Sequence, residues 1–402
     1  MKSKLKEFTL PEEVRGKFDS FVKKLSSDPY SNPTKKMQIM SDKLECLFPQ
    51  ELLATLKNMG KTGEPGAIII KNFPIDKEVP RAETVAMRSQ QKGLASENAM
   101  LGTVALMGYK LESNPKEQEG RPVHNVAPVK SHENTKSSKG RDPFYLHIEN
   151  PFEKSPPDFL MLVGLEGDKT AKTSLFFVDG FIKKLPNWVV EGMKKPEFEI
   201  RSGEGFDKEE KGIFPLIKID EETGRQRLRT YQKDERITPL TDEAKKVLSY
   251  VTESFKDVEK TDDYLAVGLQ PGEAIIFNNG WGLDKVTGVM HGREGRISNQ
   301  NRWLQRGFLH QQTEKDRLNI ADGYFQSVSQ VIADTDNFSI KNAALFLRKA
   351  MLETNSCKEY KEKHPDASDA QVSLYGLKAD NNSKQSWLAR VTKESVENRS
   401  II

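Results

Sequence analysis

The chain has 402 residues, of which 36% are hydrophobic and 30% are charged, so it is long enough to bury a large core. Its net charge of +3 is small against 62 basic and 59 acidic residues that are spread along the chain, which argues against nucleic acid as a partner. The two cysteines, Cys46 and Cys357, lie far apart and outside any CxxC pattern, so neither a disulfide framework nor a thiolate zinc site is indicated.

The first 65 residues are predicted to form a helical N-terminal segment. The opening, MKSKLKEFTL, lacks the apolar region and the small-residue cleavage site of a secretory signal, and no later run approaches the roughly eighteen apolar residues of a membrane helix. We therefore expect a cytoplasmic protein without a membrane partner. Residues 41–60, SDKLECLFPQELLATLKNMG, space their leucines as a helix does and end at Gly60, a candidate helix terminator.

Residues 66–312 are predicted to form a jelly-roll core, with the double-stranded β-helix arrangement of a cupin. Short apolar runs are separated here by Gly, Pro, Asn and Asp, which favours many short strands over a βαβ sheet. Two helices, about 179–195 and 239–258, interrupt the runs, and the pattern TPLTDEA is a capping signal for the second. The fold class is thus mixed α+β, a jelly roll with flanking helices.

Residues 313–402 return to helical patterns and form a predicted C-terminal extension. Polar stretches such as KADNNSKQSW indicate that its end is disordered.

The stretch YLHIENPF, residues 145–152, holds the first candidate site. Pro151 stops a helix from continuing, so the segment is expected to be extended. On a strand, residues two apart face the same side, and His147 and Glu149 then converge on one point above the sheet. Taken alone, such a pair is more simply interpreted as a surface histidine beside an exposed carboxylate.

A second stretch, GVMHGREGRISNQNRWLQR, changes that interpretation. It sets His291 at the end of an apolar run, with Arg302 eleven residues later and Arg306 fifteen residues later. Two histidines and one carboxylate are the ligand set of non-haem Fe(II) oxygenases. Arginine is the side chain best suited to clamp the far carboxylate of a dicarboxylate cosubstrate.

Together these motifs resemble the clavaminate synthase-like branch of the Fe(II)/2-oxoglutarate-dependent dioxygenases, in the TauD/TfdA superfamily. The resemblance runs over residues 66–310, through GAIIIKNFPI, FYLHIENPF, PDFLMLVGLEGDKTAKTSLFFVDG, LQPGEAIIFNN, VMHGR and RWLQR. It implies that Fe(II), 2-oxoglutarate and O2 are used, and that a C–H bond of a free amino acid or an amino-acid-derived small molecule is hydroxylated with release of succinate and CO2. Desaturation and ring closure remain open.

The resemblance also implies roles for single residues. The iron ligands are His147, Glu149 and His291. Arg302 binds 2-oxoglutarate, together with Thr173 or, as the alternate, Ser174. Substrate-binding residues implied in the same way are Arg306, Glu149, Asp234, Ser137 and Ser138, with Asp234 placed to grip a basic side chain. The alternative interpretation of Asp234 is a solvated charge in a mixed-charge loop.

Other candidates have simpler interpretations. His124 and His132 are expected to be hydrogen-bonded loop residues rather than pocket walls. Trp281 and Trp303 are expected in the core.

Two further functions compete with an oxygenase. A cupin-like metal-binding isomerase shares the strand pattern but has no need of Arg302 and Arg306. A catalytically inactive relative acting as a binding protein has no need of the three intact ligands. Oligomeric state is not predicted.

Overall fold

The computed structural model describes residues 4–22, 33–79, 93–112, 121–135, 139–203, 209–221, 223–283, 285, 287–313 and 361–366. The chain divides into two compact units, Met1–Gln311 and Gln312–Ile402. The predicted C-terminal extension therefore lies outside the described residues, except for 313 and 361–366. Among the described helices, none has the length and apolar character needed to cross a membrane.

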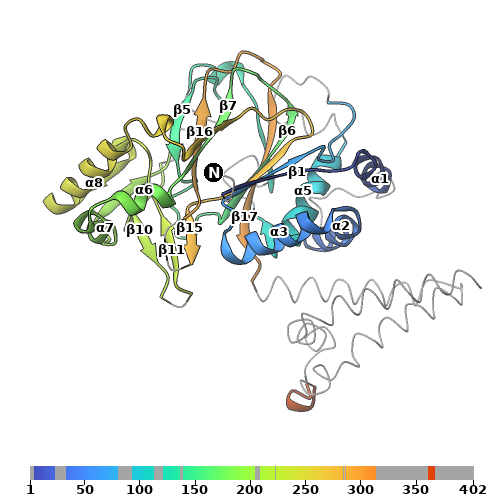
Figure 1. The fold of residues 1–402 in the computed structure, drawn as a ribbon, viewed down its shortest axis with the longest axis horizontal. Helices are drawn as coiled ribbons and strands as arrows, with labels where there is room; N and C mark the ends of the chain where they lie inside the picture. Colours follow the sequence, from blue (N-terminus) through green and yellow to red (C-terminus); the bar gives the residue numbers. More distant parts are fainter. Residues whose placement is uncertain are drawn as a thin grey trace, which may run out of the picture. The chain divides into compact units, whose positions relative to one another are not determined.

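A seven-stranded sheet is the larger layer of the first unit (Figure 1). Its order is β1-β2-β14-β6-β17-β3, with β4 also paired to β17. The strands are β1 (Leu5–Thr9), β2 (Ala67–Lys71), β3 (Tyr109–Leu111), β4 (Val123–Val126), β6 (Phe159–Glu166), β14 (Ala274–Asn278) and β17 (Trp303–Gln311). β1 pairs with β2 in parallel, and the other pairs are antiparallel.

A four-stranded antiparallel sheet in the order β13-β7-β16-β5 is the second layer. It consists of β5 (Phe144–His147), β7 (Lys172–Phe177), β13 (Tyr264–Val267) and β16 (Val289–Glu294). One apolar cluster joins its Leu175 and Val289 to Leu160, Ile275 and Phe308 of the large sheet. The two layers therefore share a core, as the predicted jelly roll requires.

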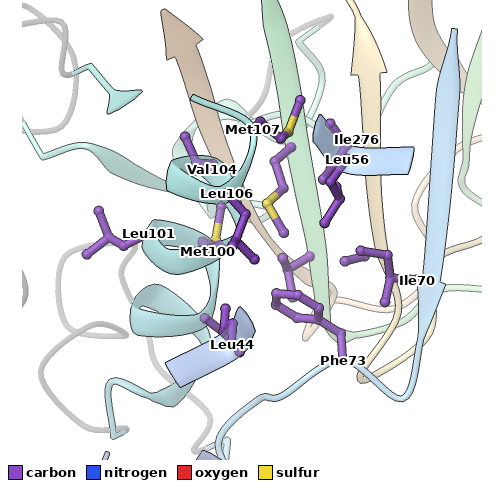
Figure 2. Close-up of a cluster of buried hydrophobic side chains, with 14 of the residues drawn as sticks. Leu44, Leu56, Ile70, Phe73, Met100, Leu101, Val104, Leu106, Met107 and Ile276 are labelled. Carbon is purple, nitrogen blue, oxygen red and sulfur yellow. The ribbon is translucent and has the colours of Figure 1, made fainter. Parts of the chain in front are cut away.

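Four of the helices in the described part of the chain cover the other face of the large sheet. They are α1 (Glu12–Val22), α2 (Pro33–Leu47), α3 (Gln50–Thr62) and α5 (Ala95–Leu106). Figure 2 shows Leu44, Leu56 and Met100 of these helices gathered against Ile70 and Ile276 of the sheet. Because both faces of the sheet are buried, its strands are apolar at nearly every position, which explains runs such as AIII and FLMLVGL.

A third region, residues 178–260, packs on the outer face of the small sheet. It contains α6 (Asp179–Lys184), α7 (Asn187–Met193), α8 (Asp242–Ser254), and the sheet β12-β8-β9, formed by Ile237–Pro239, Phe198–Arg201 and Lys211–Phe214. A second small sheet, β10-β11-β15, joins Ile217–Ile219, Arg225–Leu228 and Trp281–Leu283. The 3-10 turns are η2 (Lys130–His132), η3 (Asp234–Arg236) and η4 (Val258–Lys260).

Local details differ from the sequence predictions in three places. The helix expected over 179–195 is two helices, broken before Pro186, whose ring prevents the first from continuing. The predicted cap of α8 is confirmed, since the Thr241 side chain accepts a hydrogen bond from the Ala244 N–H at 3.0 Å. Gly60 does not end α3: the helix runs on to Thr62, and Gly63 takes the left-handed conformation with φ 81°.

Strand β1 was not predicted. Its sequence, LKEFT, is mostly polar, and only its pairing along Ala67–Lys71 makes it a strand.

Candidate metal centre and pocket

Three side chains from the two stretches singled out in the sequence meet inside the jelly roll. One ligand atom from each of His147, Glu149 and His291 lies within 4.8 Å of the others. His147 ends β5 and is the direct cross-strand partner of His291 on β16, while Glu149 follows β5 by two residues. The Glu149 Oε2 atom lies 3.1 Å from His291 Nε2 and 3.7 Å from His147 Nε2. Strand register thus brings the two histidines together, and Glu149 joins them from the segment that follows β5.

The charges in the cluster favour the protonation states in which these groups bind a metal. Burial alone would raise the pKa of Glu149, but the Arg306 charge and hydrogen bonds from both histidines hold that pKa well below its ordinary value. Burial, followed by the charge of His147, lowers the pKa of His291 to about 4. The site therefore presents one carboxylate and a neutral buried imidazole, as a divalent cation requires.

Backbone contacts fix two of the ligands. The His147 Nδ1 atom lies 3.0 Å from the Tyr145 carbonyl oxygen, which leaves Nε2 facing the cluster. Asn279, fully buried, accepts from the Glu149 N–H at 2.9 Å and donates to the Glu149 carbonyl at 3.1 Å. The same amide donates to the Pro157 carbonyl at 2.9 Å, so it anchors the segment after β5.

A cavity of about 180 Å³ opens from the cluster. Four arginines line it, Arg236, Arg293, Arg302 and Arg306, together with Thr173 and apolar side chains such as Leu162. The ligand set of two histidines and a carboxylate, beside an enclosed space with several guanidinium groups, fits Fe(II) with an anionic cosubstrate. A structural zinc site would instead close its coordination sphere with protein ligands.

The structure separates the two hydroxyl candidates. Thr173 lines the cavity, and it is the cross-strand partner of Arg293. Ser174, the next residue on β7, faces the opposite side, where its hydroxyl accepts a hydrogen bond from Tyr264 at 2.8 Å. Only Thr173 is therefore in a position to touch a molecule in the cavity.

Arg306 reaches the metal cluster from β17. Its Nη1 atom lies 3.4 Å from Glu149 Oε1, and its Nη2 atom lies 3.0 Å from His124 Nδ1. Burial and the Arg306 charge lower the pKa of His124 to about 3, so the imidazole is neutral and Nδ1 accepts. His124 lies on β4, not on the loop that the sequence indicated, and it orients Arg306.

Arg302 and Arg293 lie beyond the cluster, and both are almost fully buried. Arg302 precedes β17, and burial lowers its pKa to about 10. The sequence analysis did not select Arg293. Its signal was present in VMHGR, because a residue two positions after His291 on a strand must face the same side.

The predicted substrate residues are less completely placed. The backbone of Asp234 belongs to η3, but its side chain lies outside what the structure describes, as do Ser137 and Ser138. Glu235 and Arg236 on the same turn, and Lys233 directly before it, line the mouth of the cavity. Trp281 and Trp303 are buried core residues, as predicted, with their indole N–H groups bonded to Asp158 O and Asn125 Oδ1.

Comparisons with known proteins point the same way as the site. The model of the family "Taurine catabolism dioxygenase TauD, TfdA family" matches residues 62–308. An L-asparagine oxygenase of Streptomyces coelicolor is 28% identical over 277 residues, which is 65% of this chain and 77% of that protein.

Solved structures share the fold. The structure of an asparagine oxygenase with Fe(II), 2S,3S-3-hydroxyasparagine and succinate has a TM-score of 0.60 and 24% identity, covering 75% of this chain and 92% of that one. The non-haem iron oxygenase OrfP, with Fe and α-ketoglutaric acid, has a TM-score of 0.61 and 16% identity, covering 77% and 95%.

Proposed function

Since the chain belongs to the taurine catabolism dioxygenase TauD, TfdA family, we propose that it hydroxylates a C–H bond of a free amino acid or of a small molecule derived from one. It is a non-haem Fe(II)/2-oxoglutarate-dependent dioxygenase of jelly-roll fold. The single observation that carries the substrate class is Arg306, a cation with 11% of its side chain exposed, beside the metal cluster and lining the cavity. An amino acid carboxylate is the natural partner for a guanidinium group in that position.

Several polar groups of the cavity have a task in this reaction. His147, Glu149 and His291 would hold Fe(II), which, with 2-oxoglutarate and O2, supplies the oxidising power and yields succinate and CO2. Arg302 and Thr173 would hold the distal carboxylate of 2-oxoglutarate. Arg306, oriented by His124, would bind the substrate carboxylate, and Glu149 is close enough to accept from the substrate ammonium.

The remaining walls position the substrate and exclude water. Leu162, Leu304 and Val126 line the inner part of the cavity and Tyr231 lines it beside His147. An apolar lining of this kind keeps water from the reacting centre, while the fixed arginines hold both organic molecules in one orientation.

The names of the relatives narrow the first substrates to try. The structures just compared include a hydroxyasparagine complex, and an OrfP structure at a TM-score of 0.62 and 17% identity contains (3R,4R)-dihydroxy-L-Arg. Asparagine and arginine therefore head the list of candidates. Cytoplasmic location stays a prediction.

The test is a screen of the twenty standard amino acids for stimulation of Fe(II)-dependent succinate release. We expect one or a few to stimulate it, with the hydroxylated product detected by mass spectrometry. Stimulation by none would move the substrate class to a peptide-bound or modified amino acid. Failure to convert 2-oxoglutarate at all, even without substrate, would instead favour the cupin-like isomerase or the inactive binding protein.

A further inference from the structure

Arg293 is another arginine of the cavity, and the reaction as proposed above gives it no role. It lies on β16 two residues after His291, with 5% of its surface exposed. Burying an arginine is costly, because its guanidinium group is removed from water. The position therefore requires an explanation in terms of what the cavity binds.

The strand order puts Arg293 at the cosubstrate end of the cavity. Arg293 stands near the end of β16 and Arg302 immediately before β17, on either side of the turn 295–301. The cross-strand partner of Arg293 is Thr173, which is proposed to bind 2-oxoglutarate together with Arg302. From His291 to Arg293 the strand rises by roughly 6.6 Å. That is comparable with the length of an extended 2-oxoglutarate reaching from the metal to its distal carboxylate.

The guanidinium of Arg293 is held in place by a backbone carbonyl and an aromatic ring. Its Nε donates to the Asp142 carbonyl oxygen at 3.1 Å, and its Nη2 donates to the same oxygen. The group also lies 5.1 Å above the centre of the Phe144 ring. The Asp142 carboxylate itself pairs with Arg296, an exposed arginine on the turn. Arg293 is thus oriented by a backbone acceptor.

The second guanidinium group at this end of the cavity is that of Arg302. The carboxylate whose charge acts on Arg302 is that of Asp168, which accepts hydrogen bonds from Thr170, Ser298 and Asn299 backbone N–H groups. Asp168 therefore ties together the two turns that precede Thr173 and Arg302. Burial, followed by the charge of Arg302, lowers the pKa of Arg293, and two buried cations that repel each other in this way are stabilised when an anion binds between them.

We propose that Arg293 and Arg302 together form a two-guanidinium site for the distal carboxylate of 2-oxoglutarate. Arg293 then contributes to the selection of 2-oxo dicarboxylates over 2-oxo monocarboxylates of the same chain length. The inference rests on the proposed function, because it assumes that 2-oxoglutarate binds in this cavity.

The experiment measures binding to the Fe(II)-loaded protein without oxygen, so that it does not depend on turnover. Dissociation constants are determined for 2-oxoglutarate and for 2-oxopentanoate, which has the same carbon chain but lacks the distal carboxylate. The variants are Arg293→Met, which keeps the length and apolar stem, and Arg293→Lys, which keeps the charge. Arg296→Met is the matched control, since Arg296 bonds the carboxylate of the same Asp142 but is exposed.

We expect Arg293→Met to weaken 2-oxoglutarate binding by about tenfold or more and to change 2-oxopentanoate binding less than about twofold. Arg293→Lys is expected to weaken 2-oxoglutarate binding less than Arg293→Met does, because lysine keeps the positive charge but lacks the bidentate geometry of the guanidinium group. Arg296→Met is expected to leave both constants unchanged.

Equal weakening of both 2-oxo acids would show that Arg293 is only structural, and an unchanged 2-oxoglutarate constant would remove it from the site. If Arg293→Met does not fold, Arg293→Lys and Arg293→Gln are compared by the same ratio of constants. A wild-type protein that binds neither 2-oxo acid would contradict the proposed function itself, and this is seen before any variant is made.

Discussion

The metal end of the cavity and its mouth are built from different kinds of structure. At the metal end, His147 and His291 are cross-strand neighbours in the small sheet, and Arg306 comes from a strand of the large sheet. At the mouth, Lys233 and Glu235 are exposed residues on or beside the short turn η3. A buried pair of sheets fixes side chains in place, whereas a turn is free to change sequence without disturbing the core.

This difference suggests a division of roles: the metal end serves the reaction itself, and the mouth serves the choice of substrate. Binding iron and 2-oxoglutarate requires fixed ligands, and the residues proposed for this task stand on paired strands or directly beside their ends. Discrimination between amino acid side chains requires contacts at the far end of the cavity, where η3 lies. If the division is right, changes at the metal end abolish the reaction, and changes at the mouth alter the choice of substrate.

The largest expected effect is the loss of a metal ligand. His147→Ala, Glu149→Ala and His291→Ala are each expected to lower Fe(II)-dependent succinate release by more than about a hundredfold, because loss of a ligand exceeds the roughly 10- to 100-fold cost of altering its supporting contacts. The measurement is succinate release, with circular dichroism to show that the fold is kept. His364→Ala, an exposed histidine, is the control. Wild-type turnover in any one of the three would remove that residue from the metal site.

The next effect tests whether the frame around the ligands matters. Asn279→Ala removes both hydrogen bonds that the amide makes to the Glu149 backbone. We expect Fe(II) affinity to fall by about 10- to 100-fold, as for other residues that support a ligand. The matched control is Asn278→Ala, which removes an equally buried amide bonded to Gly63 and Trp281 instead. A similar loss of affinity in both variants would indicate general destabilisation.

Arg302 and Arg306 are expected to bind different molecules, 2-oxoglutarate and the amino acid substrate respectively. Arg302→Ala is expected to raise the Michaelis constant for 2-oxoglutarate at least tenfold, because a charge-assisted bidentate contact is worth roughly 1.5 to 3 kcal/mol. Arg306→Ala is expected to act mainly on the Michaelis constant of the amino acid. Steady-state kinetics with each molecule varied in turn distinguish the two. The opposite pattern would exchange their roles.

A smaller effect is expected at Thr173, whose neutral hydroxyl is proposed to contact 2-oxoglutarate. Thr173→Val keeps the shape of the side chain and removes one hydrogen bond of about 0.5 to 1.5 kcal/mol. The Michaelis constant for 2-oxoglutarate should therefore rise by about two- to tenfold. Ser174→Ala is the neighbouring control, since its hydroxyl bonds Tyr264 on the other face of β7. If Ser174→Ala has the larger effect, the inward face of β7 is wrongly assigned.

The sequence was sufficient for the fold class and the three metal-binding candidates because both are indicated by short motifs, and by the family resemblance that these motifs carry. His147 and Glu149 share a face by their spacing, and apolar runs on both sides of them indicated a buried sheet. Register, in contrast, is a long-range property, and it alone separates Thr173 from Ser174 and brings Arg293 beside Thr173. Strand β1 and the Asn279 contacts were unpredicted for the same reason, since each depends on a partner far away in the chain.

The smallest effects are expected at the mouth, where Glu235 and Asp234 are adjacent acidic residues on η3. Glu235 lines the cavity and is exposed, so an ion pair with a basic substrate is screened by water and worth at most about 1 kcal/mol. If the substrate is arginine or lysine, Glu235→Gln or Asp234→Asn should raise its Michaelis constant only by about two- to fivefold. Succinate release without substrate should be unchanged, because neither residue belongs to the metal end. Comparing the two variants identifies which carboxylate contacts the substrate side chain. Loss of substrate-free turnover in either one would mean that the mouth and the metal end are not separate.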